Sequence, residues 1–266
     1  MKVGKVNIVI PLFNQEEFIE QCLNSAMAQT YPDFDITVVN DGSTDHSMVV
    51  VREMVDRWNG EMRELMVKRY AEAEMMEPVP GCWNFNGRLK IIDRENRGLS
   101  VSRNEGIRGG DGEFILPLDS DDFIESNYLE KTVPKMADLK VGIVSTDMQY
   151  QGLLHNRIPP KGLSLAHEMV TNDLPVCSLI RRAAWEQTKG YEDIFVEVAG
   201  STKVLGYEDW EMWISILKRG WQVAVVNEPL FNYRVRSGSM ISQSKTQHNG
   251  LVRIIHLLHP DLWART

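Results

Sequence analysis

The sequence predicts an α/β protein with a mostly parallel central sheet flanked by helices. Short apolar runs rich in β-branched residues alternate with runs of helical periodicity as far as about Thr146. A strand, a helix and a second strand in this order form a βαβ unit, which pairs its strands in parallel. Polar and acidic residues directly follow several of the apolar runs, at the edge where open α/β sheets bind ligands. We therefore expect one continuous sheet rather than an antiparallel sandwich.

The composition is that of a soluble globular protein with a substantial core. The chain has 266 residues, of which 43% are hydrophobic and 25% charged. Its net charge of −8 argues against a nucleic-acid partner, which would favour a basic face. Cys22, Cys82 and Cys177 are few, odd in number and widely spaced, so neither a disulfide framework nor a zinc site follows. Without a signal-peptide pattern or an apolar run near the ~18 residues of a membrane span, we expect a cytoplasmic protein that can contact a membrane only at its surface.

The first βαβ unit begins near the N-terminus. Residues 6–10 read as a buried strand that Pro11 ends, and residues 35–39 as a second, β-branched strand. Between them, Asn14 and Glu17 match a capping box, with Asn14 as the N-cap of a helix. The apolar residues of this helix recur at helical spacing: Phe18, Ile19, Cys22, Leu23 and Ala26.

The second strand leads into a polar loop at residues 40–45. One interpretation is a helix start, with Ser43 or Thr44 as the cap. The other is a loop at the rim of the sheet that binds a base or a ribose, with Asp41 as its carboxylate. The helix that follows carries four apolar residues on one face: Met48, Val51, Val55 and Trp58.

Residues 60–87 are predicted to be an insertion. They comprise a charged helical piece at 61–74 and a stretch rich in proline and glycine, with a candidate β-hairpin at Asn86–Gly87. Because long insertions at a sheet rim are usually functional or disordered, we expect a lid or a contact for an acceptor or partner.

Three carboxylates within four positions follow the predicted strand at 113–118: Asp119, Asp121 and Asp122. In an extended chain Asp119 and Asp121 point the same way, and two adjacent carboxylates tolerate each other best with a cation between them. Hard oxygen ligands suit Mg²⁺ or Mn²⁺. The alternative is an acidic turn that caps the next helix. Arg103, on a short helix before this strand, is either a surface cation or the residue that orients the acids from behind.

In the second half, Glu208 and Asp209 open a predicted helix with four apolar residues on one face: Trp210, Trp213, Ile214 and Leu217. The acids either favour the helix dipole or supply a general base. Residues 153–173 give no assignment. The other predicted elements are strands at 88–92, 141–146, 178–182 and 221–226, helices at 127–138, 183–188 and 246–258, and a polar loop at 233–239.

Taken together, these motifs resemble family 2 glycosyltransferases, which have the GT-A fold. Four stretches carry the resemblance, and two weaker ones follow: Val9–Asn14, Val39–Asp45, Asn96–Gly98 with Ser102–Ile107, and Leu118–Asp122, then Gly206–Trp210 and Tyr233–Ser239. The resemblance implies a nucleotide-sugar donor, a divalent metal and inversion at the anomeric carbon.

The resemblance also implies roles for individual residues. The nucleotide-binding set is Pro11, Phe13, Asp41, Ser43, Arg103 and Asp119. Asp41 would hydrogen-bond the base, which for uracil means its N3–H, while Asp119 and Asp121 would hold Mn²⁺ or Mg²⁺. Asp209 would be the catalytic base, and its place at a helix start would keep its pKa low. Glu208 is the rival base, because adjacent residues at a helix start point in different directions.

Two positions depart from the family pattern. Asn40 stands where aspartate is frequent, and Arg236 stands where many members have a histidine near the metal. One interpretation is that Arg236 replaces a metal ligand and contacts the diphosphate directly. The membrane spans and the Gln-x-x-Arg-Trp motif of processive synthases are absent, so we expect transfer of one sugar, from a UDP-sugar, to a glycan or lipid-linked acceptor. The predicted organisation is one GT-A domain over residues 1–266: a nucleotide-sugar-binding half at 1–122, an acceptor and catalytic half at 123–240, and a helical tail at 241–266.

Two other classes of function stay open. A sugar nucleotidyltransferase would use a similar sheet, but it would need a glycine-rich, basic loop where this chain has Pro11–Asn14. A non-catalytic nucleotide-binding protein would not need the complete set of acids that this sequence retains.

Overall fold

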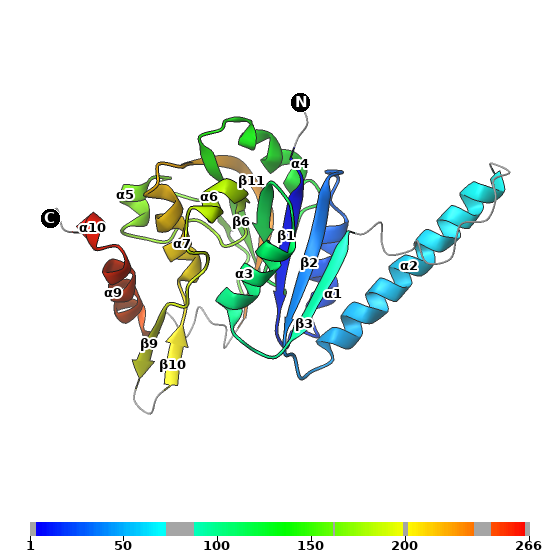
Figure 1. Cartoon of the computed structure of the whole chain (residues 1–266), viewed down its shortest axis with the longest axis horizontal. Helices are drawn as coiled ribbons and strands as arrows, with labels where there is room; N and C mark the ends of the chain where they lie inside the picture. The colour runs from blue at the N-terminus through cyan, green and yellow to red at the C-terminus, as the bar shows by residue number, and fades with distance from the viewer. Residues whose placement is uncertain (1–3, 73–87, 162, 199–201, 237–245, 264–266) are drawn as a thin grey trace.

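The computed structural model describes residues 4–72, 88–161, 163–198, 202–236 and 246–263. Its centre is one curled sheet with the strand order β3-β2-β1-β4-β8-β6-β11-β5, and β7 pairs with β6 (Figure 1). The strands of this sheet are β1 (Val6–Leu12), β2 (Phe34–Asp41), β3 (Leu89–Arg94), β4 (Phe114–Pro117), β5 (Phe123–Ile124), β6 (Val141–Gly152), β7 (Arg157–Ile158), β8 (Leu179–Arg181) and β11 (Gln222–Val235). A separate hairpin pairs β9 (Phe195–Val198) with β10 (Thr202–Leu205).

Helices flank this sheet. They are α1 (Ile19–Met27), α2 (Ser47–Glu72), α3 (Leu99–Gly109), α4 (Tyr128–Thr132), α5 (Leu165–Glu168), α6 (Arg182–Glu186), α7 (Glu208–Leu217), α9 (His248–Leu258) and α10 (Pro260–Trp263), with a 3₁₀ helix at Val133–Ala137. None of the described helices is long and apolar enough to cross a membrane.

The predicted α/β fold with a mostly parallel sheet is confirmed. β3, β2, β1 and β4 pair in parallel, as the βαβ pattern requires. β8 is antiparallel to both β4 and β6, so the sheet becomes mixed in the second half, where β6 and β11 are again parallel. Successive side chains of β1 point to opposite faces of the sheet and belong to two hydrophobic cores. Ile8 and Ile10 pack with α1, while Val9 packs with Ile107 of α3.

β1 is longer than predicted, because the strand runs through Pro11 to Leu12. β4 pairs with β1 only as far as Val9, which lies opposite Pro117. Beyond that point Pro11 has a strand neighbour on one side only, Val39 of β2, where the missing N–H of proline is tolerated.

The predicted caps of the first two helices are wrong. α1 begins at Ile19, because Asn14 adopts a left-handed φ of 51° and its Oδ1 accepts a hydrogen bond from the amide of Thr44 (2.8 Å). Asn14 therefore fixes the loop after β2 instead of capping its own helix. α2 begins at Ser47, whose amide donates to Oδ1 of Asp45 (2.9 Å), so an acid caps this helix rather than either predicted hydroxyl.

The charged piece at 61–74 is not a separate segment, because α2 is one helix that extends to Glu72. Figure 1 shows α2 starting at the carboxyl edge of the sheet and leading away from it, so that its far end projects beyond β3. The predicted hairpin at Asn86–Gly87 lies outside the described residues. The role of residues 60–87 as a lid or contact surface stays a prediction.

In the second half, three predicted boundaries are wrong. β11 continues to Val235, so the predicted loop at 233–239 starts inside a strand; a register shift around Pro229 lets β11 keep pairing with β6. The predicted helix at 127–138 splits into α4 and a 3₁₀ turn that has Pro134 in its first turn. Strand β6 also runs further than residue 146, as far as Gly152.

The apolar residues of α7 serve two faces instead of one. Trp213 and Leu217 pack into the core beside the sheet. Trp210 and Ile214 pack instead against α9, in a cluster with Leu251. A helix that is apolar on most sides is buried, and α7 is accordingly held between the sheet and the C-terminal helices.

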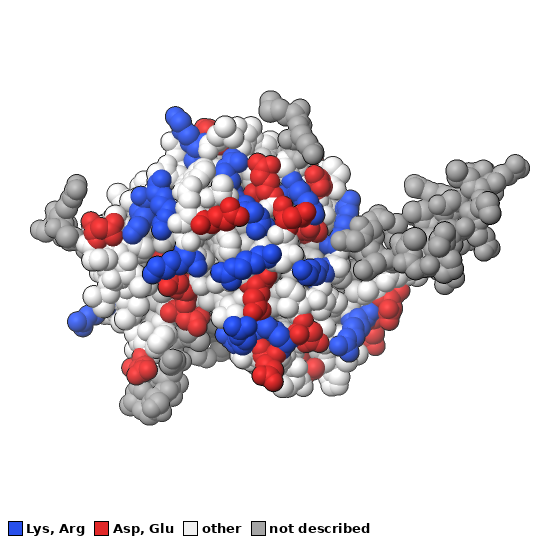
Figure 2. Space-filling view, in the orientation of Figure 1, with Lys and Arg blue, Asp and Glu red and all other residues white. Residues whose placement is uncertain are grey.

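Charges are mixed on the surface. Figure 2 shows Lys and Arg side chains interspersed with Asp and Glu on the face it displays, so neighbouring charges of opposite sign neutralise one another there.

We predict that α3 needs glycine at position 106 to approach the sheet. A Cβ atom on Gly106 would lie 2.3 Å from Cγ1 of Val9 and 3.1 Å from Cγ2 of Val39. Gly106→Ala should therefore lower the free energy of unfolding by about 1–3 kcal/mol in a denaturant titration. Gly60→Ala is the control, because a Cβ on Gly60 of α2 would meet no described atom outside its own helix within 4 Å. That variant should be neutral or more stable by about 0.5–1 kcal/mol. Equal midpoints for wild type and Gly106→Ala would contradict the close approach.

Candidate functional site

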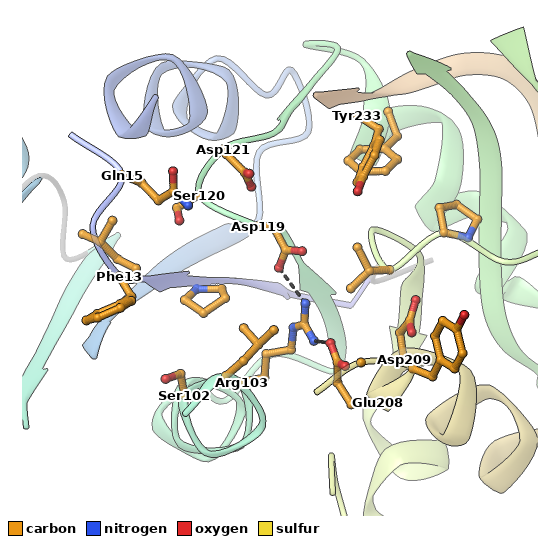
Figure 3. A pocket seen from close by; sticks show the side chains of 18 of the residues that line it. Phe13, Gln15, Ser102, Arg103, Asp119, Ser120, Asp121, Glu208, Asp209 and Tyr233 are labelled. Atoms are coloured by element: carbon orange, nitrogen blue, oxygen red, sulfur yellow. Dashed lines mark hydrogen bonds and ion pairs between the residues drawn. The ribbon is translucent and has the colours of Figure 1, made fainter. Parts of the chain in front are cut away.

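A cavity of about 790 Å³ lies at the carboxyl edge of the sheet. It is lined by residues from the ends of β1, β2 and β4, from α3, from the loop before β8 and from the start of α7 (Figure 3). The predicted site residues that line it are Pro11, Phe13, Asp41, Arg103, Asp119, Asp121 and Asp209. Ser43 is not among the lining residues; its Oγ accepts a hydrogen bond from the amide of Asn14 (3.1 Å).

The acidic stretch after β4 forms a turn, because the amide of Asp122 donates to the carbonyl of Asp119 (3.0 Å). The expected extended geometry, with both side chains aligned by pleating, is therefore wrong. Each carboxylate has its own cation: Nη2 of Arg103 lies 2.7 Å from Oδ1 of Asp119, and Nη2 of Arg236 lies 2.6 Å from Oδ2 of Asp121. Burial and the charge of Asp119 raise the pKa of Asp121, and Arg236 opposes this rise.

Arg103 is buried, with 1% of its side chain exposed, so it is not a surface cation. Its guanidinium bridges two acids, since Nη1 lies 2.6 Å from Oε1 of Glu208 while Nη2 binds Asp119 (Figure 3). It also lies over the ring of Tyr191, 5.2 Å from the centroid. Burial alone would lower the pKa of Arg103, but the carboxylates of Asp119 and Glu208 outweigh it and raise the pKa. The second interpretation, that Arg103 orients the acids from behind, agrees with this geometry.

Asp209 differs from Glu208 because its hydrogen-bond partners among the described residues are neutral. Its Oδ1 accepts from the amide of Trp210 (2.8 Å), and its Oδ2 accepts from Nδ2 of Asn172 (3.2 Å). Burial, and then the charge of Glu208, raise the pKa of Asp209 to about 6. The expectation that the helix start would lower this pKa is wrong, because burial outweighs the dipole and the amide hydrogen bonds.

Asp41 lines the cavity, but its carboxylate already accepts hydrogen bonds from other groups of the protein. Oδ1 accepts from the amide of Arg97 (2.7 Å) and from the guanidinium of Arg94, while Oδ2 accepts from the amide of Gly98 (2.9 Å). Oδ2 can accept one more hydrogen bond, which leaves room for a base N–H. Asp41 therefore also holds the loop that leads into α3.

Sequence reasoning missed the loop between α5 and β8, which lies within or just after the unassigned residues 153–173. Asn172 and Asp173 line the cavity, and Asn172 holds the carboxylate of Asp209. Glu168 is fully buried below them; burial and the charges of Asp173 and Asp209 raise its pKa to about 8. The polar run Asn172-Asp173 was a signal, but nothing in the sequence placed it beside α7.

The arrangement does not fit a resident divalent cation well. Asp119 and Asp121 are each paired with a guanidinium, and Arg236 stands at the position where the resemblance implied a histidine ligand. Among the described residues, no three His, Cys, Asp or Glu side chains gather closely enough to hold a metal ion.

The fold is that of a GT-A glycosyltransferase. The chain belongs to glycosyl transferase family 2, whose model matches residues 7–170. Glycosyltransferase GlyA of Streptococcus pneumoniae is 27% identical over 252 residues, which cover 89% of this chain and 31% of that protein. The chain thus spans about a third of the length of that relative.

Solved structures share the fold. Staphylococcus aureus TarS, residues 1–349 in complex with UDP-GlcNAc, has a TM-score of 0.65 at 18% identity and matches 95% of this chain and 66% of that one. The mannosyltransferase PcManGT of Pyrobaculum calidifontis, in complex with GDP-Man and Mn²⁺, has a TM-score of 0.59 at 19% identity over 90% of this chain and 59% of that one.

We predict that the charge of Asp209 destabilises the folded protein. The pKa of Asp209 is about 6 in the fold against an ordinary 3.8, so folding disfavours its ionised form. Stability from this group is present below pH 4 and is lost as the pH rises through 6. Asp209→Asn should therefore raise the free energy of unfolding at pH 8 by about 1–3 kcal/mol, and the gain should shrink toward zero at pH 4. Glu192→Gln removes a carboxylate outside the cavity as the control. A gain that is equal at both pH values would contradict the prediction.

Proposed function

We propose that this protein transfers one sugar from a nucleotide-diphosphate sugar to a hydroxyl group of a glycan or lipid-linked acceptor, with inversion at the anomeric carbon. One observation carries the proposal: Arg103 joins Asp119, on the nucleotide side of the cavity, to Glu208, beside the candidate base. Because one buried guanidinium contacts both acids, it holds the nucleotide side of the cavity at a fixed distance from the start of α7. Membership of family 2 supports the same reaction class.

The donor would lie along the carboxyl edge of the sheet. Pro11 and Phe13 form one wall of the cavity, and Phe13 is 46% exposed, so its ring is available to a base. Asp41 would accept a base N–H with its remaining capacity. Uracil, through its N3–H, is our candidate base. TarS bound to UDP-GlcNAc supports this choice by analogy of fold alone.

Asp209 would act as the general base. It accepts the proton of the acceptor hydroxyl while the acceptor oxygen forms a bond to the anomeric carbon on the face opposite the diphosphate. The bond between that carbon and the diphosphate oxygen breaks, and the nucleoside diphosphate leaves. Glu208 is less suited, because its carboxylate is held 2.6 Å from the guanidinium of Arg103. A carboxyl with a pKa of about 6 is ionised at neutral pH and still basic enough to take a proton.

The divalent cation implied by the resemblance would be held by Asp119 and Asp121, and it would neutralise the leaving diphosphate. PcManGT with Mn²⁺ supports this expectation by fold. The guanidinium partners of both acids oppose it, because each already neutralises its carboxylate. We also propose the division into a donor half at 1–122 and an acceptor half at 123–240, since the cavity has donor residues from the first and Asp209 from the second.

Donor hydrolysis tests the reaction class. Without an acceptor, the protein should slowly release nucleoside diphosphate from one member of a panel that contains UDP-GlcNAc and GDP-Man. Release of pyrophosphate from a nucleoside triphosphate would contradict the proposal and indicate a sugar nucleotidyltransferase. Binding of the panel with no turnover, with or without candidate acceptors, would indicate a non-catalytic nucleotide-binding protein.

We predict that Asp209→Asn lowers kcat by about 10²–10⁴-fold, the usual cost of losing a general base, and leaves donor affinity nearly unchanged. For the wild type, kcat/KM should fall about tenfold per pH unit below pH 6, as the base becomes protonated. Glu208→Gln is the matched comparison, because it removes the neighbouring charge and loosens Arg103. Near-normal turnover in Asp209→Asn together with loss in Glu208→Gln would reverse the two roles.

A further inference from the structure

We propose that Arg236 binds the diphosphate of the donor and supplies the positive charge that the resemblance assigns to a divalent cation. This inference rests on the proposed function, because it names how the same cavity holds its substrate. In this arrangement Asp121 is not primarily a metal ligand. Its carboxylate orients Arg236.

Three side chains hold the Arg236 guanidinium at the cavity. It follows the end of β11, and its Nη2 lies 2.6 Å from Oδ2 of Asp121 and 3.0 Å from Oε1 of Gln15. Its Cζ lies over the ring of Phe18, 4.9 Å from the centroid. A guanidinium stacked on a ring and anchored by a carboxylate has lost most of its rotational freedom, so binding an anion costs it little further entropy.

The guanidinium also keeps donors for a ligand. Asp121 and Gln15 both accept hydrogen bonds from Nη2, and Nη1 has no hydrogen-bond partner among the described residues. Nε is buried and has no hydrogen-bond partner, an unfavourable state for a buried donor. About a third of the side chain (35%) is exposed, and it lines the cavity. Nη1 therefore offers two N–H donors beside the positive charge of the guanidinium, so a diphosphate in the cavity can be bound here.

A diphosphate in this cavity needs a positive charge such as that of Arg236. Among the described lining residues, the only other cation is Arg103, which is committed to Asp119 and Glu208. The remaining ionisable lining residues include Asp41, Asp173 and Asp209, so a diphosphate without Arg236 would face mainly carboxylates. A metal ion at Asp121 would have to share the carboxylate with this guanidinium, and the two positive charges would repel each other.

Isothermal titration calorimetry tests this inference. The ligands are UDP and UMP, with GDP and GMP as the second pair, each measured in EDTA and in MnCl₂. Wild type should bind the diphosphate in EDTA, with a Kd within about threefold of that in Mn²⁺, because Arg236 already supplies the charge. Arg236→Ala should weaken diphosphate binding by at least about tenfold and monophosphate binding by less than about threefold, since the lost contact is to the outer phosphate.

Three further variants make the result specific. Arg236→Lys keeps the charge but loses the two N–H donors of Nη1, and it should recover part of the affinity. Arg236→His should bind weakly in EDTA and regain at least about tenfold with Mn²⁺, because imidazole leaves Asp121 free for a metal. Arg57→Ala removes an arginine of α2 that pairs with Glu20 outside the cavity, and its binding should equal that of the wild type. Thermal unfolding of each variant shows whether it is folded.

The outcomes separate the two proposals. Wild-type binding that disappears in EDTA and returns with Mn²⁺, or a folded Arg236→Ala that binds like the wild type, would overturn the role of Arg236 and leave the transferase intact. Absence of nucleoside diphosphate binding in both buffers, over UDP, GDP, CDP, ADP and dTDP, would overturn the proposed function and this inference with it.

Discussion

The site depends on one buried guanidinium. Arg103 contacts Asp119, 16 positions along the chain, and Glu208, 105 positions along, with almost none of its own side chain exposed. Loss of Arg103 would leave two acids near each other without their cation, and a buried charge without its partner is strongly destabilising. The close approach of α3 at Gly106, nearly one turn after Arg103, brings the helix near enough to the sheet for this contact. The ion pairs of Arg103 therefore depend on the close packing of α3 against the sheet.

Around this cation, three carboxyl groups of one chemistry acquire different properties from their surroundings. Glu208 is ion-paired, Asp209 has neutral partners and a pKa of about 6, and Glu168 is buried with a pKa of about 8. When the surroundings separate the pKa values of carboxyl groups in this way, one group can accept a proton at a pH at which another keeps its own. The raised pKa of Asp209 is also a cost in stability, which is common for groups held ready for chemistry.

Much of the fold follows from local pattern. The alternation of β-branched and helical-period runs is a property of neighbouring residues, and it predicted the four parallel strands of the first half. Most of the other predicted elements begin within two residues of their observed start. The errors occur where distant contacts prevail: β1 tolerates Pro11 at the point where β4 stops pairing, Asn14 bonds to Thr44 rather than to its own helix, and β11 crosses Pro229 because β6 continues beside it.

The sequence by itself determined the class of fold and the edge of the sheet at which the acids lie, because strand ends and short motifs consist of consecutive residues. Only the tertiary structure decided how those residues are paired. It placed Asn172 against Asp209 and used most of the hydrogen-bonding capacity of the Asp41 carboxylate. It also paired Arg236 with Asp121, which lies 115 positions away in the chain. Charge partners so far apart in the chain are selected by the burial and approach of whole elements, and a residue's pKa depends on that burial more than on its place at a helix start.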